Sequence, residues 1–461
     1  MIPLFFKKSL YSKRRKDFSE NLEPGRDLCV LFTQPERTRS FDGHFPFRPD
    51  NNFLYLTGFA EPQSVMLLWR EDGAPRGKSS KIIFKMGVLP RDRTMEQWNG
   101  YRYGVEGAKK LCEANDAFDF SELKTQIQNW LSQVPSPGKR PRIFSNCFEY
   151  PEWKIHLDRI VENFHPPHRS KIQPLEGILD CRHWIGKSRL VKSKEEIENM
   201  RKSSDINVQA HLEVMKGIRP GMMEYEAQAL AENVFVKNGA ANAYNSICAT
   251  GSNATILHYN FNSSRMKEGQ LFLIDAGCEY QFFTSDITRT LPVSGKYSDK
   301  QRALMEIVSA AQQTAFKMSK PGQSLAKIHE SVSDTLIDGL KDLKIMKGKT
   351  SAIRSSGEHR VYYPHGTGHW LGMDVHDACP YLDSKGNPLK LETGMIFTVE
   401  PGLYFLKDEK SVSEEWRGLG VRIEDDILIT SRGYENLTED LPRTANEIEK
   451  FMKRKNSSFQ S

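Results

Sequence analysis

The stretch LIDAGCEYQFFTSDITRT, residues 273–290, places two aspartates inside segments that otherwise have the composition of buried β-strands. Asp275 lies near the end of an apolar run, and Asp286 precedes a run that mixes branched apolar residues with threonines. A hairpin centred between Tyr280 and Gln281 would set the two aspartates opposite each other, with their Cβ atoms about 5 Å apart. Facing, partly buried carboxylates repel each other and lose hydration. The stretch therefore predicts a positive charge between these two carboxylates.

The bulk composition is that of an ordinary soluble globular protein. The 461 residues are 38% hydrophobic and 27% charged, and the chain is long enough for two domains or three. The formal net charge of +6 comes from basic residues scattered along the chain, which argues against a nucleic-acid partner. The 7 cysteines include no CxxC pair, so we expect reduced thiols in an intracellular compartment. No apolar run approaches about 18 residues, which predicts no membrane insertion.

Composition divides the chain into three parts. Residues 1–17, MIPLFFKKSLYSKRRKD, are basic and fit either a basic N-terminal tail or the remnant of a mitochondrial presequence. Residues 18–185 mix strand-like and helix-like segments and predict a smaller α/β domain. Residues 186–461 open with a capping box at Ser193 and Glu196 and predict a second α/β domain.

The second domain contains a faint internal repeat. Two pairs of predicted helices flank the turns Pro220-Gly221 and Pro321-Gly322. After each pair comes a glycine with a carboxylate six residues later, and then a second acidic strand. We therefore expect a duplicated α/β unit whose acidic groups converge at a pseudo-twofold axis. The four carboxylates are, in chain order, Asp275, Asp286, Glu400 and Glu424.

Four converging carboxylates predict a metal site, because hard divalent cations prefer oxygen ligands. The segment YYPHGTGHWLGMDVHD adds His365, His369 and His376. The first two are four residues apart, but the glycines between them make a helical zinc motif improbable, so a strand or loop presentation is expected. Four carboxylates and one imidazole fit two metal ions about 3.5–4 Å apart, bridged by a hydroxide.

Each candidate residue also has a simpler explanation when taken alone. Asp286 could belong to a polar network at a strand end, and Glu400 could simply end a strand before Pro401-Gly402. Glu424 shares a strand face with Arg422 and Asp426 and could lie on a solvated edge, and His258 could be a core histidine. The conjunction of all these residues favours a functional site.

Several motifs resemble the aminopeptidase P branch of the pita-bread metallopeptidases, a superfamily that also includes prolidase and methionine aminopeptidase. The matching segments are LIDAGCEY, SDITRT, HGTGHWLGMDVHD, TVEPGLY and GVRIEDD, together with FPFRPDNNFLYLTGFAEP and SRLVKSKEEIENMRK nearer the N-terminus. The resemblance covers nearly the whole chain and includes the eukaryotic mitochondrial members of the branch. It implies a pita-bread catalytic domain with a pseudo-twofold repeat, preceded by a smaller α/β domain.

The resemblance also implies roles for particular residues. The metal ligands fall on Asp275, Asp286, His369, Glu400 and Glu424. The substrate-binding positions fall on Tyr244, His258, His365, His376 and Arg422. Of these, the residues expected to take part in catalysis are Glu400, His258, His365 and His376.

The implied function is that of a manganese-dependent Xaa-Pro aminopeptidase. Such an enzyme hydrolyses the first peptide bond of a peptide or protein when residue 2 is proline. We expect a metal-bridged hydroxide as nucleophile, Glu400 as proton shuttle, and two Mn²⁺ ions per subunit, although the ligand set also suits Co²⁺ or Zn²⁺. The resemblance further implies a homo-oligomer, either a dimer or a tetramer.

Three alternatives remain at the level of sequence. The site could belong to a mitochondrial intermediate-cleaving peptidase, which removes one bulky N-terminal residue from imported proteins. It could belong to a prolidase, which accepts only dipeptides, or the fold could serve a non-catalytic interaction protein, which the complete ligand set argues against. The basic N-terminus favours a mitochondrial location, with the cytoplasm as the alternative.

Overall fold

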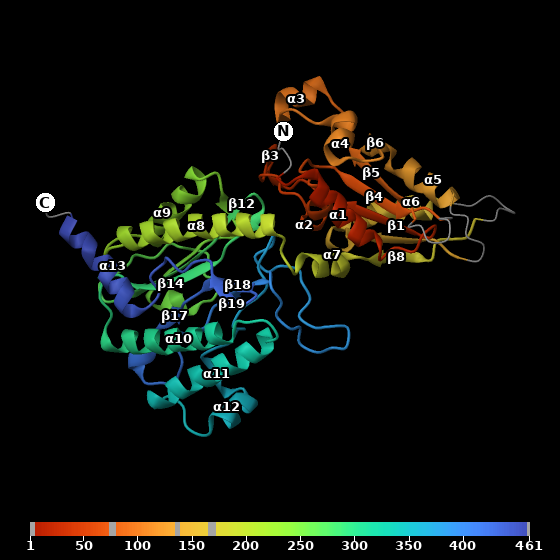
Figure 1. Ribbon diagram of the computed structural model, residues 1–461. Helices are drawn as coiled ribbons and strands as arrows, with labels where there is room; N and C mark the ends of the chain where they lie inside the picture. The colour runs from red at the N-terminus through yellow and green to blue at the C-terminus, as the bar shows by residue number, and fades with distance from the viewer. Residues whose placement is uncertain (1–4, 73–79, 134–138, 165–171, 459–461) are drawn as a thin grey trace. The chain divides into compact units, whose positions relative to one another are not determined.

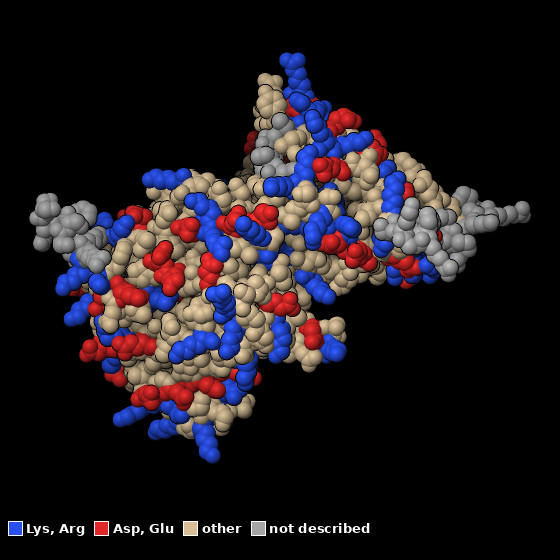
Figure 2. Space-filling model, in the orientation of Figure 1, with Lys and Arg blue, Asp and Glu red and all other residues tan. Residues whose placement is uncertain are grey.

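The computed structural model describes residues 5–72, 80–133, 139–164 and 172–458 and divides into two compact units, Met1–Ser188 and Arg189–Ser461 (Figure 1). Each unit combines helices and strands, as predicted. On the face drawn in Figure 2, Lys and Arg side chains are interspersed with Asp and Glu.

A six-stranded mixed sheet organises the N-terminal unit, with strand order β6-β5-β4-β1-β7-β8. These strands are β1 (Asp27–Phe32), β4 (Val65–Arg70), β5 (Ile82–Val88), β6 (Asp116–Asp119), β7 (Arg142–Ser145) and β8 (Gly177–Asp180). A separate hairpin joins β2 (Thr38–Ser40) to β3 (Gly43–His44). The helices are α1 (Lys8–Ser19), α2 (Asn51–Thr57), α3 (Arg93–Asn99), α4 (Gly104–Cys112), α5 (Leu123–Gln133), α6 (Pro151–Glu162) and α7 (Arg182–Arg189).

Helix α1 corrects the prediction of a basic tail for residues 8–17, and residues 1–4 of the predicted tail lie outside the described part of the chain. Residues 8–17 are helical, and both Arg14 and Arg15 are buried. The guanidinium of Arg15 donates to the carbonyl of Leu56 at 2.9 Å and to that of Cys112 at 3.0 Å, in the last turn of α2 and at the last residue of α4. The final carbonyls of a helix lack partners within the helix, so an arginine is well suited to satisfy them. The basic residues of this segment are therefore partly structural.

The C-terminal unit is built from two similar halves. In each half a helix pair precedes a three-stranded antiparallel sheet, β10-β11-β14 in the first and β15-β18-β19 in the second. The helix pairs meet at the two predicted Pro-Gly turns, and the capping box at Ser193 and Glu196 is present. In Figure 1, strands β14, β17 and β18 lie between α8 above and α10 below. The prediction of a duplicated α/β unit is confirmed.

The bounds of these elements are as follows. The helices are α8 (Lys194–Gly217), α9 (Glu224–Lys237), α10 (Asp299–Met318), α11 (Leu325–Asp342), α12 (Thr350–Ser356) and α13 (Ala445–Ser458). The sheet strands are β10 (Ile247–Thr250), β11 (Leu271–Ala276), β14 (Ile287–Pro292), β15 (Ile396–Val399), β18 (Asp425–Thr430) and β19 (Gly433–Asn436). Shorter strands are β9 (Ala241–Asn242), β12 (Cys278–Tyr280), β13 (Phe283–Thr284), β16 (Gly402–Tyr404) and β17 (Gly420–Arg422).

The hairpin that contains Asp275 and Asp286 has a register two residues away from the predicted one. Asp275 pairs with Thr288, not with Asp286, so the turn is centred between Gln281 and Phe282. Both turn residues have positive φ, 48° and 66°. Turns of this kind usually carry Asn or Gly, so the sequence gives no signal for this position. Because side chains alternate with a period of two, the shift keeps both aspartates on the same face.

Candidate metal centre

The two aspartates of the first half meet through a tyrosine hydroxyl. Tyr244 Oη lies 2.5 Å from Asp275 Oδ1 and 2.5 Å from Asp286 Oδ1. Arg422 Nη2 donates to Asp275 Oδ2 at 2.5 Å, and both aspartates are buried. One hydroxyl proton serves only one carboxylate at a time, so Tyr244 and Arg422 do not fully neutralise the pair. The positive charge expected from the sequence is therefore supplied only in part by the chain itself.

The second half contributes His369 from an extended segment beside β15. The backbone of Thr398 donates to the carbonyl of His369, and the backbone of Glu400 donates to that of Thr367. This segment is not helical, as the flanking glycines predicted. His369 Nδ1 lies 3.1 Å from the carbonyl of Trp370, so it carries the proton that it donates there. The other ring nitrogen, Nε2, is thereby turned towards the carboxylates.

The remaining two carboxylates lie beside this imidazole. Glu400 directly follows β15, and its Oε1 is 3.7 Å from His369 Nε2, while Asp286 Oδ2 is 3.5 Å from the same nitrogen. Glu424 lies between β17 and β18, and its Oε2 accepts a hydrogen bond of 2.7 Å from Thr288. One ligand atom each from Asp286, His369 and Glu424 lie within 4.8 Å of one another. The structure thus brings the halves of the repeat together at one point.

The pKa values of the clustered groups indicate an excess of buried negative charge, which a cation would compensate. Burial raises the pKa of Glu400 to about 7 and raises the pKa of Glu424 well above its usual range, with the neighbouring carboxylates adding to the effect on Glu424. Burial and the charge of Asp275 also raise the pKa of Asp286. Burial lowers the pKa of His369, but its hydrogen bond to Asp286 and the charge of Glu400 outweigh this and raise it to about 9. The donor set and its excess negative charge fit divalent metal ions.

A cavity of about 370 Å³ opens beside the carboxylates. His258 and His376 lie in its wall and are exposed, so the alternative of a core histidine at His258 is wrong. The rings of His376 and His369 have their centroids 4.0 Å apart. Partial burial of the ring in the cavity wall and the charge of the nearby His369 lower the pKa of His376 to about 4, so its imidazole is neutral near pH 7. The lining residues are Tyr244, Asn245, Ile247, His258, Asn260, Asp275, Asp286, Val375 and His376.

His365 reaches the site through Tyr404, a residue that sequence reasoning did not single out. His365 Nδ1 lies 2.8 Å from the carbonyl of Gly366 and is therefore the donor, so Nε2 accepts from the hydroxyl of Tyr404 at 2.9 Å. That hydroxyl accepts in turn from Arg422 Nη1 at 2.9 Å. Burial and the charge of Arg422 lower the pKa of His365 to about 3. Tyr404 is the last residue of the TVEPGLY motif, and its place in that motif was the only indication in the sequence that it belongs to the site.

The strand face shared by Arg422, Glu424 and Asp426 is buried, so the alternative of a solvated edge is wrong. Asp426 Oδ2 accepts from the backbone of Asp286 at 3.2 Å and from the hydroxyl of Ser204 at 3.1 Å. Asp426 and Thr288 thus belong to the surroundings of the cluster. Neither residue could be assigned a function from the sequence, because each contacts the cluster through a neighbour that is distant along the chain.

This fold and this donor set define a metallopeptidase of the pita-bread class. The model of metallopeptidase family M24 matches residues 198–431, and that of the aminopeptidase P N-terminal domain matches residues 11–136. The chain therefore belongs to the aminopeptidase P family of the M24 metallopeptidases.

Individual relatives agree with this assignment over nearly the full chain. The chain is 36% identical to Xaa-Pro aminopeptidase of Escherichia coli, covering 96% of this chain and 97% of that protein. It is 33% identical to human Xaa-Pro aminopeptidase 3, covering 92% and 80%, and 30% identical to mitochondrial intermediate cleaving peptidase 55 of Arabidopsis thaliana, covering 96% and 82%. Proline aminopeptidase P II from Yersinia pestis superposes with a TM-score of 0.90 at 36% identity, covering 97% of this chain and 100% of that one.

None of the described helices has both the length and the apolar character needed to cross a bilayer, over residues 5–72, 80–133, 139–164 and 172–458.

Proposed function

We propose that this chain is a metal-dependent aminopeptidase that removes the first residue from peptides whose second residue is proline. The observation that supports the proposal most strongly is the convergence of four carboxylates and His369 beside an open cavity. The residues proposed to hold the metal are Asp275, Asp286, His369, Glu400 and Glu424. Xaa-Pro substrates are proposed from the relatives, among them the E. coli Xaa-Pro aminopeptidase.

The proposed mechanism assigns proton transfer to Glu400. When bound, a pair of divalent cations supplies Lewis acidity and brings the pKa of water near neutrality. Glu400 accepts a proton from the attacking water and passes it to the leaving nitrogen. The proline nitrogen must gain this proton before it can leave as an amine. The neutral imidazole of His365 lies beside the Glu400 carboxylate, with Nδ1 3.5 Å from Glu400 Oε2.

The cavity residues are proposed to bind the substrate backbone. His376 is neutral near pH 7 and can donate one hydrogen bond to a carbonyl oxygen on which negative charge develops. His258 lines the same cavity and can act from the other side of the substrate. Tyr244 contacts both Asp275 and Asp286, so it places the substrate wall next to the metal ligands.

The test is an assay with two peptides that differ only at residue 2, which is proline in one and alanine in the other. Mass spectrometry follows loss of the first residue with Mn²⁺ and with a chelator. We expect metal-dependent trimming of the proline peptide. Failure to trim it under any metal condition would contradict the proposal.

A matched pair of aspartate variants ties the activity to the site. Asp286→Ala is expected to lower kcat/KM by more than about 100-fold. This exceeds the loss of about 10–100-fold that is typical when a residue that contacts a metal ligand is removed, because Asp286 is itself a proposed ligand. Asp205→Ala removes an exposed aspartate on α8 and is expected to retain the unaltered rate. Equal rates in the two variants would exclude Asp286 as a ligand.

A second candidate function is supported by the Arabidopsis relative, an intermediate cleaving peptidase with mitochondrial in its name. This function would show as trimming of the alanine peptide too, best when Tyr, Leu or Phe comes first. A mitochondrial location is proposed with it, although Arg14 and Arg15 are buried in α1, so the location rests mainly on that relative. Imaging of the full chain with a C-terminal fluorescent tag tests it, and a cytoplasmic signal would contradict it.

Two finer properties are proposed from the family. Manganese is proposed as the metal, and elemental analysis of protein purified without added metal tests it against cobalt and zinc. A dimer or tetramer is proposed as the assembly. Light scattering should then give two or four times the chain mass of 52.8 kDa, and a single chain mass would contradict this.

A further inference from the structure

We propose that Gln312 is a positioning residue for the metal centre, a role that rests on the proposed function. Gln312 lies in α10 and is fully buried. It holds together the two chain segments that carry Glu400 and Glu424. Its side-chain hydrogen bonds go to residues next to these glutamates rather than to their carboxylate groups.

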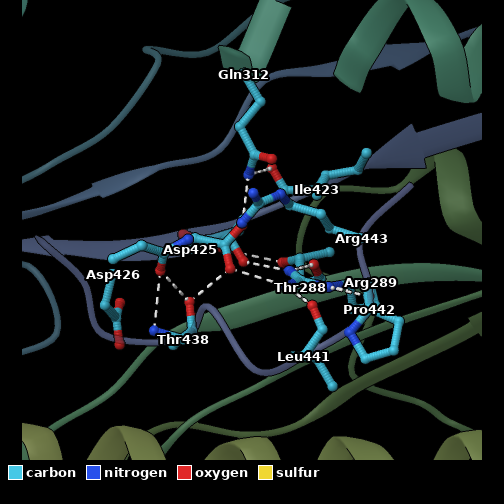
Figure 3. A network of polar contacts seen from close by, with 12 residues as sticks. Thr288, Arg289, Gln312, Ile423, Asp425, Asp426, Thr438, Leu441, Pro442 and Arg443 are labelled. Atoms are coloured by element: carbon cyan, nitrogen blue, oxygen red, sulfur yellow. Dashed lines mark hydrogen bonds and ion pairs between the residues drawn. The ribbon is translucent and has the colours of Figure 1, made fainter. Parts of the chain in front are cut away.

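One amide group reaches both segments. Gln312 Nε2 donates to Asp425 Oδ2 at 2.7 Å and lies 3.4 Å from the carbonyl oxygens of Val399 and Ile423 (Figure 3). Val399 immediately precedes Glu400, and Ile423 immediately precedes Glu424. The two glutamates belong to different strand segments, so this amide bridges the positions that must stay in register for both to bind the same metal pair.

The same amide belongs to a buried polar clamp, which we define as Gln312, Arg289, Asp425 and Thr438. Asp425 Oδ1 accepts from Arg289 Nη2 at 2.8 Å and from Thr438 Oγ1 at 2.5 Å, so Gln312 is the partner of the other oxygen. Arg289 Nη1 donates to the carbonyl of Glu424 at 2.7 Å. The clamp therefore holds the backbone carbonyls of Ile423 and Glu424 and the side chain of Asp425, and its charges compensate each other inside the core.

The two sides of the Gln312 amide are used differently. Among the described residues, Oε1 of Gln312 is buried without a hydrogen-bond partner. Such orphaned acceptors are rare because they lose hydration without compensation. The donor side of the amide is fully used, whereas the acceptor side is not. The contacts of Gln312 therefore come from its N–H groups, which hold the two ligand-bearing segments together. Metal sites need this, since ligand distances must hold to within about 0.2 Å.

The test compares two glutamines of the same helix. Gln312→Met keeps the side-chain volume but removes both N–H donors. Gln301→Met is the matched control, because Gln301 is also buried on α10 and also donates to a backbone carbonyl, that of Gly269. Mn²⁺ binding to the metal-free full chain is measured by calorimetry, and thermal unfolding of the metal-free variants is measured alongside.

We expect Gln312→Met to weaken Mn²⁺ binding by about 10–100-fold, the range seen when an outer partner of a ligand is lost. Gln301→Met should bind Mn²⁺ as the unaltered chain does, whatever its unfolding temperature. Binding by Gln312→Met within about twofold of the unaltered chain would overturn the positioning role. Absence of Mn²⁺ binding by the unaltered chain would instead overturn the proposed function, and with it this role.

A second variant covers the case in which Gln312→Met does not fold. Gln312→Asn keeps the amide but is one methylene shorter, so it cannot reach the same three oxygens from the same backbone position. Weakened Mn²⁺ binding by a folded Gln312→Asn supports the role. Unfolding of both variants would assign Gln312 to stability alone and overturn it.

Discussion

His369 and the carboxylates Asp286, Glu400 and Glu424 occupy a space in which they cannot all be charged without a counter-ion. The raised pKa values of the three carboxylates express this conflict, since each stays neutral to higher pH than usual. The raised pKa of His369 reports the same excess of negative charge, because it favours the cationic imidazolium. Bound cations would take the place of these protons. The pKa values thus describe a site built for cations.

The metal affinity of this cluster should depend on pH. Folded-state pKa values of about 7 for Glu400 and about 9 for His369 lie above the ordinary values, so both groups bind extra protons near neutrality. Metal binding must release them, and affinity should therefore rise with pH between about 6 and 9. Calorimetry in two buffers of different ionisation enthalpy measures the protons released. Zero release at pH 7 would contradict this description of the site.

Tyr404→Phe tests the contact between Arg422 and His365. The change removes a hydroxyl that accepts from Arg422 and donates to His365, while the ring still packs. We expect kcat/KM for the proline peptide to fall by about 10-fold and the free energy of unfolding by about 1 kcal/mol. Steady-state kinetics and urea unfolding measure the two quantities. Tyr297→Phe, which removes another buried hydroxyl, is the control, and an equal loss of activity there would contradict a specific role for Tyr404.

Residue identity was easier to predict than residue contact. The motifs named Asp275 and Glu424 because both carry chemistry and stand at recognisable spacings. Thr288 and Tyr404 escaped notice because a threonine or tyrosine in a strand is ordinary until its neighbours in space are known. Asp426 looked solvated because alternation within one strand does not reveal whether both faces are covered.

Among the elements, α1 shows how a helix can depend on contacts that are remote in sequence. Its charges gave it the composition of a tail, but Arg14 and Arg15 satisfy carbonyls about 41 to 97 residues away. No local pattern carries that information. The two Pro-Gly turns and the capping box at Ser193 were predictable because all of their determinants lie within a few consecutive residues. The hairpin register was not, since Gln281 and Phe282 adopt positive φ against their preference.

A pair of variants in α1 tests the structural role of its arginines. Arg15→Ala leaves two helix-terminal carbonyls without their donor and is expected to lower the free energy of unfolding of the N-terminal unit by about 2–4 kcal/mol. Lys13→Ala removes an exposed ion pair with Asp17 and should change it by less than about 0.5 kcal/mol. Urea unfolding followed by tryptophan fluorescence measures both. Equal stability of the two variants would restore the interpretation of a tail.

In the whole molecule, the proposed metal ligands all lie in one of the two compact units, the C-terminal unit. The four carboxylates lie in or next to its strands, and His369 lies in the segment beside β15. The α/β class and the repeat were predictable from periodicity and motif order. The described structure adds the way the halves join, through the bridge between Thr288 and Glu424.

Metal removal should act on the C-terminal unit alone. A metal present at 100 times its Kd stabilises the folded state by about 2.7 kcal/mol, so chelation is expected to lower the Tm of that unit by about 5 °C. Scanning calorimetry with chelator and with added Mn²⁺ measures the shift. Asp286→Ala, with a ligand missing, should show a much smaller response to Mn²⁺. An unaltered chain whose Tm is insensitive to chelator would contradict a metal bound in the folded state.

The two halves of the repeat are proposed to hold a pair of divalent cations between them. Anomalous X-ray scattering from crystals grown with Mn²⁺ tests this directly. We expect two anomalous peaks about 3.5–4 Å apart, within bonding distance of the five proposed ligands. Those ligands are Asp275, Asp286, His369, Glu400 and Glu424. Peaks elsewhere in the molecule, or none at this cluster, would contradict it.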